Sequence, residues 1–361
     1  MSRPGVLPAQ ALRALVEAGA ISGEPPILAD QVQPASLDLR LGRRAWRVRA
    51  GFLPGRKRTV AERLADFAMH EIDLDGGAAF ETGCVYVAPL AERVRLPADV
   101  AGFANAKSSI GRIDLFTRVI TDHGVEFDRA PPGYDGPLWA EISPRTFSVL
   151  ARPGARLTQL RLRRGEARFT DRQLDFIHRS LGLVEGAALI DGGLGFSVDL
   201  SGAPGGPIAW RARPHSGLID LDRLEHYAPL DFWDPIERPT HGGVILDPGA
   251  FYILVSRESV HVPPDCAAEM TPYMAVAGEF RVHYAGFFDP GFGHAASGGA
   301  GSRAVLEVRC HESPFALEHG QVVGRLVYEP MADTPDILYG EEIGSTYQRQ
   351  GLRLSKHFRG T

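Results

Sequence analysis

The sequence predicts a mainly β protein that contains two tandem copies of one folding unit. Short apolar runs alternate with Gly, Pro and Asp turn signals along most of the 361 residues, which is typical of strands joined by tight turns. The 41 glycines and 27 prolines agree, because a β-sandwich, jelly roll or barrel needs many turn residues. The clearest predicted strands cover 45–48, 84–87, 147–150, 157–162, 251–255 and 325–328.

An internal repeat with an offset of 166 residues predicts the two copies. Residues 83–87 (Gly-Cys-Val-Tyr-Val) align with 249–253 (Gly-Ala-Phe-Tyr-Ile), since 249 − 83 = 166. At the same offset, 139–142 (Trp-Ala-Glu-Ile) align with 305–308 (Val-Leu-Glu-Val). Matches in the same order at a constant offset indicate a tandem duplication. We therefore expect one domain at 1–165 and a second at 166–361.

Each copy is expected to open with a short amphipathic helix. Apolar residues recur at three to four positions in 9–18 and in 171–181, a spacing that places them on one side of a helix. Further along, 36–39 (Ser-Leu-Asp-Leu) align with 197–200 (Ser-Val-Asp-Leu) at an offset of 199 − 38 = 161, because the intervening loops differ in length. We interpret Asp38 in this motif as structural.

The last segment, 339–361, has no repeat partner and is largely polar. Two interpretations stay open for it. It is either a frayed terminus or a lid that folds over a bound ligand.

Composition limits the classes of partner. The formal net charge of −5 gives no global attraction to nucleic acid or to an anionic membrane, and we interpret the arginine-rich stretch 43–58 as a solvated basic face. Cys84, Cys266 and Cys310 lie far apart without a C-x-x-C pair, which argues against a disulfide framework and suits a reducing compartment. The first 15 residues lack a basic and apolar leader, and no apolar run is as long as a membrane span. We therefore expect a cytoplasmic protein.

One short segment of the first copy is suited to binding phosphate. Residues 106–112 (Ala-Lys-Ser-Ser-Ile-Gly-Arg) lie between two predicted strands and bring together the side chains of Lys107, Ser108, Ser109 and Arg112. Hydroxyl groups, backbone N–H groups and cations are what a protein offers to a phosphate. An ordinary polar turn is the alternative interpretation.

Several segments taken together resemble the dCTP deaminase branch of the dCTP deaminase/dUTPase family. The resemblance covers almost the whole chain, once per half. The segments that carry it are 33–42 (Gln-Pro-Ala-Ser-Leu-Asp-Leu-Arg-Leu-Gly), 107–112, 288–293 (Phe-Asp-Pro-Gly-Phe-Gly), 306–307 (Leu-Glu) and 347–351 (Tyr-Gln-Arg-Gln-Gly).

The resemblance implies two tandem dUTPase-like distorted β jelly-roll domains, and a homo-oligomer, with a trimer favoured. It also implies hydrolysis of dCTP to dUTP and ammonia without zinc, with Mg²⁺ carried by the triphosphate, and dTTP as a candidate inhibitor. The H-x-E and P-C-x-x-C signatures of zinc nucleobase deaminases do not occur in the sequence. Neither nucleic acid nor a membrane is expected as a partner.

Two glutamates match the family's catalytic glutamate. Hydrolytic deamination needs a carboxylate that takes a proton from water and then returns it, which requires a pKa raised toward neutrality by a partly apolar pocket. Glu141 and Glu307 both lie inside apolar strands at equivalent positions of the repeat. A glutamate in both copies favours the deaminase branch over the dUTPase branch, although Tyr134-Asp135-Gly136 resembles a dUTPase segment and a bifunctional enzyme is conceivable.

The resemblance assigns further residues to the nucleotide. Ser108, Ser109 and Arg112 match the triphosphate-contacting segment, with Lys107 where an arginine is more usual, and lysine lacks the bidentate fork. The remaining two matches come from the second half. Asp289 matches the hairpin aspartate that contacts the deoxyribose, while Tyr347 and Gln350 match the tail that closes over the phosphates.

The two copies have not kept the same motifs. At offset 166 the phosphate segment meets 274–278 (Met-Ala-Val-Ala-Gly), which has neither a hydroxyl nor a cation. The simplest hypothesis is a composite site in which the first half binds the phosphates and the second half supplies Asp289 and Glu307. In a rival version Glu141 is the catalyst, with Asp122, His123 or Asp128 at the sugar.

Two other functions stay open. One is hydrolysis of dUTP to dUMP and pyrophosphate. The other is a non-catalytic nucleotide-binding or scaffold protein whose altered motifs mark lost activity.

Overall fold

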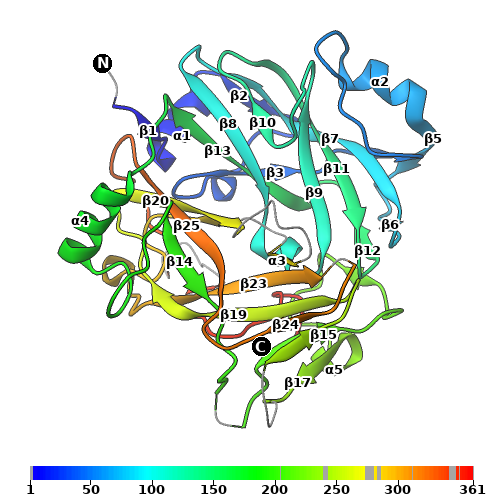
Figure 1. Ribbon diagram of the computed structural model, residues 1–361. Coiled ribbons are helices and arrows are strands. Elements are labelled where there is room, and N and C mark those ends of the chain that lie inside the picture. Colours follow the sequence, from blue (N-terminus) through cyan, green and yellow to red (C-terminus); the bar gives the residue numbers. More distant parts are fainter. Residues whose placement is uncertain are drawn as a thin grey trace. The chain divides into compact units, whose positions relative to one another are not determined.

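A computed structural model describes residues 3–203, 205–238, 243–272, 280–282, 286–310, 312–340, 347–348 and 350–360. Twenty-five mostly short strands and five short α-helices are present in these ranges (Figure 1), so the prediction of a mainly β fold is confirmed. In the same ranges, none of the helices combines the length and apolar character that crossing a membrane requires. The segment 274–278, which the repeat places opposite the phosphate motif, lies outside the described residues.

The chain forms two compact units. Unit 1 contains residues 1–167, and unit 2 begins at 168. Two later segments, 217–224 and 331–336, also belong to unit 1, although they lie in the second half of the sequence. Each unit is built mainly from antiparallel sheets.

Unit 1 contains a five-stranded sheet (β1-β13-β8-β10, with β3 beside β13), a six-stranded sheet (β5-β4-β7-β11-β9, with β2 beside β7) and a small sheet (β16-β12-β6). Its strands are β1 Gly5–Val6, β2 Ile21–Gly23, β3 Leu37–Arg40, β4 Arg44–Val48, β5 Ala68–Asp73, β6 Ala78–Phe80, β7 Val85–Arg95, β8 Val100–Ala106, β9 Leu115–Thr121, β10 Arg129–Ala130, β11 Asp135–Pro144, β12 Val149–Ala151, β13 Arg156–Arg164 and β16 Ile219–Asp220. Its helices are α1 Ala9–Glu17, α2 Val60–Phe67 and α3 Ser108–Gly111, with a 3₁₀ turn at Ala29–Gln31.

Unit 2 contains sheets of the orders β14-β25-β20-β22 and β17-β15-β19-β23-β21, and the pair β18-β24. Its strands are β14 Leu194–Ser197, β15 Ala209–Ala212, β17 Trp233–Ile236, β18 Val244–Leu246, β19 Phe251–Val260, β20 Cys266–Pro272, β21 Phe280–Val282, β22 Phe287–Phe288, β23 Ser302–Cys310, β24 Phe315–Leu317 and β25 Val322–Pro330. Its helices are α4 Asp171–Leu181 and α5 Pro229–Phe232, with a 3₁₀ turn at Ala295–Ser297.

Matching contacts in the two units reproduce the sequence repeat. The Tyr86 hydroxyl accepts a hydrogen bond from the Glu81 N–H at 3.0 Å, and the Tyr252 hydroxyl accepts one from the Asp247 N–H at 2.9 Å. Both pairs are related by the offset of 166 residues. Burial raises the pKa of both tyrosines. The same tight turn therefore precedes β7 and β19.

The two predicted N-terminal helices are present as α1 and α4. Helix α4 spans the predicted range, because the Thr170 hydroxyl accepts from the Gln173 N–H at its start and Gly182 adopts φ = 67° at its end. Helix α2 was not predicted from the sequence, although Thr59 and Glu62 form a capping box at its first turn. It begins directly after the arginine-rich stretch 43–58 that we interpreted as a solvated face.

Helix α2 packs against the six-stranded sheet of unit 1 (Figure 1). A small apolar cluster joins the helix to the sheet. Its buried members are Val48, Phe52, Val60, Leu64, Val87 and Ile120, and Phe67, Phe127 and Trp139 pack against them.

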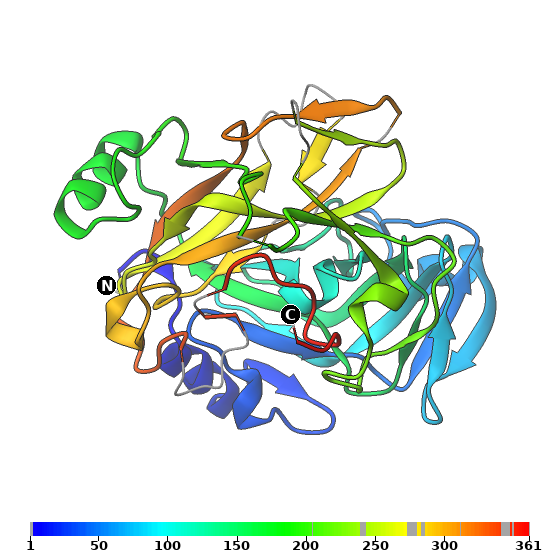
Figure 2. The same ribbon diagram turned by 90° about the horizontal axis from the view of Figure 1, so that it is seen from below.

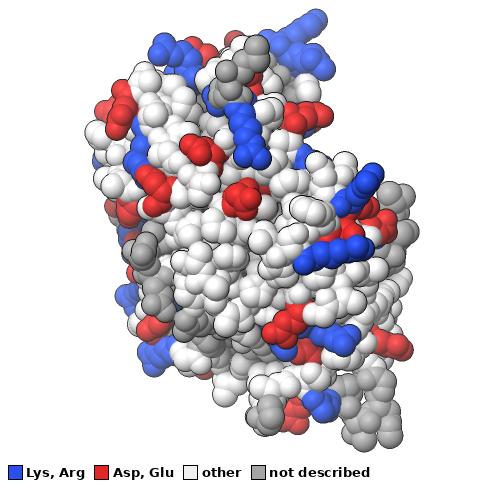
Figure 3. Space-filling view, turned by 90° about the vertical axis from the view of Figure 1, so that its left-hand side faces the viewer, with Lys and Arg blue, Asp and Glu red and all other residues white. Residues whose placement is uncertain are grey.

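Charged side chains form no extended patch of one sign on the face shown in Figure 3, where cations and carboxylates are interspersed. Several cations of the arginine-rich stretch are paired. Arg44 lies 3.2 Å from Glu71, and Arg58 lies 2.6 Å from Asp66. Exposed pairs of this kind contribute little to stability.

Candidate functional site

The phosphate motif forms a single helical turn between two strands of unit 1. Strand β8 ends at Ala106, Lys107 is the N-cap of α3, and Arg112 is its C-cap. The Ser108 side chain is exposed, whereas Ser109 and Arg112 are buried. The turn holds the hydroxyl groups and the guanidinium within five consecutive residues, as the sequence analysis expected.

Lys107 is paired with the motif aspartate of the first repeat. Its ammonium group forms an ion pair with Oδ2 of Asp38, and the Arg156 guanidinium lies 3.7 Å from the same oxygen. The Asp38 side chain is buried. The charge of Asp38 is therefore balanced by two cations, and the positive charge of Lys107 is partly neutralised.

Glu141 lies in the middle of β11 and is 3% exposed. In the sheet it stands beside Val87 of β7 and Arg118 of β9. Nε of Arg118 donates to Oε1 of Glu141 at 3.1 Å, and Nη2 contacts the same oxygen. The Arg118 guanidinium also stacks on the Phe127 ring at 3.5 Å from its centroid. Glu141 is thus held in a charge-assisted pair.

The segment that leads to α2 closes over this glutamate. A methyl group on Gly51 would overlap Oε2 of Glu141 and lie 3.0 Å from its Cδ, so a larger residue here would force the carboxylate to move. Phe52 follows in the apolar cluster beneath α2. The Glu141 carboxylate is therefore covered by the segment 51–52 of its own unit.

The residues that the rival hypothesis placed at the sugar make contacts within the fold. Oδ1 of Asp122 accepts from the Val60 N–H at 2.7 Å, at the first residue of α2. Oδ1 of Asp128 accepts from the Val119 N–H at 2.7 Å. The backbone N–H of His123 donates to the Arg58 carbonyl at 3.0 Å. These contacts hold the segment 55–60 against the end of β9.

Glu307 occupies the equivalent position in β23 of unit 2 and is 5% exposed. Leu306 and Val308 belong to the apolar core of the unit. Because successive side chains of a strand point to opposite faces, Glu307 lies on the face of β23 turned away from that core. Glu141 is approached by the segment between β4 and α2. The segment between β15 and α5 holds the same place in the second half of the sequence, and its residues 217–224 belong to unit 1.

Asp289 and the predicted tail residues come together in unit 2. Asp289 lies between β22 and a turn that contains Gly291 and Gly293, both at positive φ. Tyr347 and Gln350 are buried. The Gln350 side chain donates to the Arg303 carbonyl at 2.9 Å, and its N–H donates to the Ser302 hydroxyl at 3.3 Å. The tail is therefore bound to the start of β23, the strand that carries Glu307.

The end of the tail is also packed into unit 2 and can be followed in red in Figure 2. Leu354 and Phe358 are buried, and Phe358 forms a bridge with Tyr227. The Phe358 ring lies 5.5 Å from that of Phe232 and 6.0 Å from that of Trp233, with edge-to-face geometry. The segment 350–360 is therefore not a frayed terminus in this structure. Arg349 of the tail motif lies outside the described residues.

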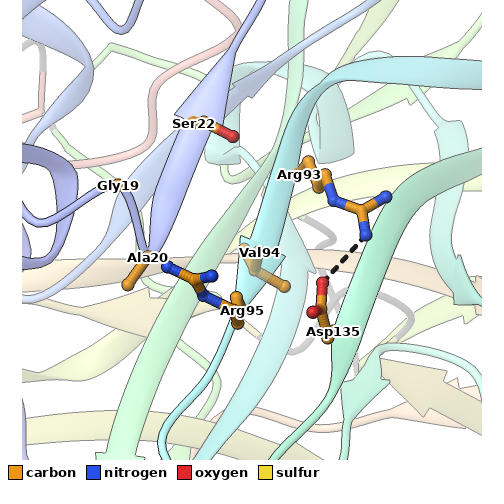
Figure 4. Close-up of a pocket in the computed structure, with 7 residues that line it drawn as sticks. All are labelled: Gly19, Ala20, Ser22, Arg93, Val94, Arg95 and Asp135. Atoms are coloured by element: carbon orange, nitrogen blue, oxygen red, sulfur yellow. Dashed lines mark hydrogen bonds and ion pairs between the residues drawn. The ribbon is translucent and has the colours of Figure 1, made fainter.

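A separate hollow of about 220 Å³ lies on unit 1 (Figure 4). The Arg93 guanidinium crosses it to pair with Asp135 at 2.8 Å, and Arg95 lies beside Ala20. Asp135 is the carboxylate of the dUTPase-like segment, so in this structure it is engaged by an exposed arginine. No predicted nucleotide-contacting residue is among the described side chains that line this hollow.

Sequence reasoning missed three residues that shape these sites. Arg118 can be assigned to Glu141 only once the register of β9 and β11 is known. Gly51 approaches Glu141 through a long-range loop, which leaves no local signal. Gln348 lies inside the tail motif that the sequence analysis quoted, but the resemblance gave it no role; its amide contacts the glycine turn after Asp289.

A duplicated β fold with a serine–arginine turn in one unit and a buried strand glutamate in each defines a class of two-unit β proteins with a candidate phosphate site. Comparison with known sequences is more specific. The pattern described as "2'-deoxycytidine 5'-triphosphate deaminase (DCD) N-terminal domain" matches residues 3–166, and that of the "C-terminal domain" matches 170–358. The chain belongs to the dCTP deaminase family, as the resemblance predicted.

Individual relatives agree with this assignment. A crystal structure titled 2'-deoxycytidine 5'-triphosphate deaminase from Agrobacterium tumefaciens is 52% identical, with a TM-score of 0.89, and the match covers 92% of this chain and 100% of that one. A protein named dCTP deaminase from Halorubrum lacusprofundi is 32% identical over 133 residues, which is 36% of this chain and 62% of the relative. One from Actinobacillus succinogenes is 30% identical over 149 residues, which is 35% of this chain and 74% of the relative. The chain thus spans less than two thirds of the length of the Halorubrum relative.

Proposed function

We propose that this chain catalyses the hydrolytic deamination of dCTP to dUTP and ammonia, in the cytoplasm and without zinc. The observation that carries the proposal is the match of both halves to the two dCTP deaminase domains, together with a buried strand glutamate in each unit. The substrate would carry Mg²⁺ on its triphosphate. Ser108, Ser109 and Arg112 would contact the phosphates, and Asp289 the deoxyribose.

We assign the catalytic carboxylate to Glu307. In the reaction a water adds to C4 of cytosine, and the carboxylate takes one proton from this water and passes it to N3. The carboxylate then takes the second proton from the new C4 hydroxyl and delivers it to the amino group, so that the C–N bond breaks, ammonia leaves and the C4 carbonyl forms. The assignment is supported by the contacts of the tail, because Gln350 is bound to Ser302 and Arg303 at the start of the strand that carries Glu307.

Separate exchange of the two glutamates tests this assignment. Glu307→Gln should lower kcat by about 100-fold or more, the range for loss of a general acid–base group. Glu141→Gln keeps the size of the side chain and should leave kcat within about threefold, since its role here is structural. Loss of turnover only in Glu141→Gln would contradict the assignment.

Product analysis separates the remaining functions. Purified protein is incubated with dCTP and Mg²⁺, and dUTP, dUMP and ammonia are resolved. The proposal expects dUTP and ammonia in equal amounts. Release of dUMP would indicate a bifunctional enzyme, and no product would favour a non-catalytic nucleotide-binding protein. Repeating the assay with dTTP tests whether this nucleotide inhibits the reaction.

We also propose a homo-oligomer, most simply of three chains. Two domains in one chain cannot by themselves close a threefold ring, so additional chains are needed for closed symmetry. Light scattering of the purified protein measures the mass directly, and a monomeric mass would contradict this proposal.

A further inference from the structure

The side-chain amide of Gln348 connects the C-terminal segment to the turn after Asp289. Its Oε1 accepts from the Gly293 N–H at 3.0 Å. Its Nε2 donates to the Gly291 carbonyl at 3.3 Å and to the Ser297 hydroxyl at 3.2 Å. The acceptor and the donor of one amide are therefore both used on a single turn, an arrangement that neither a carboxylate nor an apolar side chain can reproduce.

The turn that receives Gln348 is closely packed. Gly291 adopts φ = 98° and Gly293 φ = 65°. A methyl group on Gly293 would overlap the Val260 carbonyl, and one on Gly291 would lie 2.9 Å from the Tyr339 carbonyl. The Tyr339 N–H also donates to the Pro290 carbonyl at 2.8 Å. Gln348 therefore binds to a turn whose backbone is tightly surrounded, and Asp289 lies two residues before its first glycine.

The two tail residues assigned to the nucleotide lie close to Gln348 in the chain, Tyr347 directly before it and Gln350 two positions after it. The Tyr347 N–H donates to the Tyr339 hydroxyl at 3.3 Å, and Gln350 is bound to Ser302 and Arg303. Gln348 lies between these contacts and faces the turn. The described part of the tail is thus fixed to the hairpin by a side chain that the nucleotide assignment does not use.

We propose that Gln348 is a positioning residue that latches the tail to the Asp289 turn, so that Asp289, Tyr347 and Gln350 are presented to the nucleotide as one preformed group. The inference rests on the proposed function for its kinetic consequence. The latch, meaning the hydrogen bonds of the Gln348 amide to the turn, is already formed in the protein without nucleotide. Gln348 contributes through the residues on either side of it and through the turn, and it is not assigned a contact with the reacting atoms.

Two substitutions test the latch. Gln348→Leu removes both hydrogen-bonding groups, and Gln348→Glu keeps an acceptor for Gly293 but places a carboxylate against the Gly291 carbonyl. Each should raise KM for dCTP by about tenfold, the change expected from losing hydrogen bonds of ordinary net strength, while kcat changes by less than about threefold. A residue needed only for folding would instead lower the amount of active protein without changing KM.

Proteolysis provides a readout that does not depend on activity. In limited trypsin digestion followed by mass spectrometry without nucleotide, both variants should be cleaved within 349–356 at least about tenfold faster than the parent chain. Gln321→Leu is the matched control, because Oε1 of Gln321 accepts from the Glu318 N–H of an exposed turn, at 3.2 Å, in the same unit. It should leave both KM and the cleavage rate unchanged.

The two readouts keep the possible failures apart. Cleavage at the parental rate in both Gln348 variants would overturn the latch. Faster cleavage with an unchanged KM would overturn its role in positioning. If the parent chain does not deaminate dCTP, the proposed function fails, whereas the cleavage rates still decide whether the latch exists.

Discussion

At the scale of single residues, the two repeat-related glutamates show how one sequence position acquires two environments. Glu141 and Glu307 occupy equivalent strands and are both buried. Glu141 is contacted by a loop of its own half, where Gly51 leaves room for the carboxylate. A buried charge is tolerated when it is paired, and Arg118 supplies this partner. The close contact of Gly51 with Glu141 therefore restricts the position of a carboxylate whose role is structural.

Gly51→Ala tests this view of Glu141. The new methyl group would force the carboxylate away from its position, which should lower the free energy of unfolding by about 1–3 kcal/mol. Turnover should change by less than about threefold, because Glu307 is the proposed catalyst. Urea denaturation and steady-state kinetics measure the two effects. Gly76→Ala is the control, since Gly76 has open space around its Cα and no positive φ. A loss of kcat in Gly51→Ala alone would return Glu141 to the catalytic role.

At the scale of elements, local signals predicted some segments and long-range pairing decided others. Helix α4 could be predicted because its period and its Thr170–Gln173 capping box are both local. Helix α2 carries a capping box too, at Thr59, but the surrounding arginines suggested a solvated surface. Strand β16 has only two residues and exists through its parallel pairing with β12, which no local pattern encodes.

In the candidate site, too, local motifs could be predicted from the sequence and long-range contacts could not. The serine–arginine turn and the two strand glutamates were found because each is a compact motif or a repeat match. The loop over Glu141 and the Gln348 latch join residues more than fifty positions apart. Contacts of this kind depend on the completed fold, so the sequence alone could not supply them.

The attachment of β16 to unit 1 is expected to depend on pH. Nη1 of Arg152 contacts Oδ1 of Asp220 at 2.7 Å, and Nη2 contacts Oδ2 at 3.1 Å. This pair is the largest cause that lowers the pKa of Asp220 below 3.8. A lowered pKa in the folded state adds stability that is present above the unfolded value and is lost as the pH falls through the folded value. Protection of β16 should therefore hold at neutral pH and fall below about pH 4.

Asp220→Asn should remove this contribution at neutral pH. The Leu221 N–H, which donates to the Leu150 carbonyl at 3.1 Å, reports the pairing. We expect its hydrogen-exchange protection at pH 6 to fall by about tenfold, the effect of losing one charge-assisted contact. Asp222→Asn is the matched control, because Asp222 pairs with the same arginine but is 57% exposed, and it should change protection by less than about threefold. Equal effects of both variants would contradict a specific role for Asp220.

At the scale of the whole molecule, sequence halves and structural units do not coincide. Unit 1 includes 217–224 and 331–336 from the second half. The Ile219 N–H donates to the carbonyl of Ser148, directly before β12, and the Leu221 N–H donates to the carbonyl of Leu150 in β12. In the second segment, the Ala332 N–H donates to the Val6 carbonyl at 2.8 Å, and the Gln10 side chain donates to the Thr334 carbonyl at 2.7 Å. Segments from the second half of the sequence thus form hydrogen bonds with β12, Val6 and Gln10 of the first half.

A fragment of residues 1–166 should therefore fail to reach the structure of unit 1. It lacks both segments, and it would expose the edge of β12 and one side of α1, which favours aggregation. We expect the fragment alone to be insoluble or to unfold at least about 10 °C below the full chain, a shift that corresponds to a loss of a few kcal/mol. Co-expression with 167–361 should restore a soluble complex, because the missing segments are then supplied by a separate chain. Circular dichroism and size-exclusion chromatography of both preparations measure the folding and the solubility.

A fragment 1–166 that folds alone with the thermal stability of the full chain would contradict this prediction. It would show that the two segments add nothing to unit 1, and the duplication would then be a simple pair of independent domains.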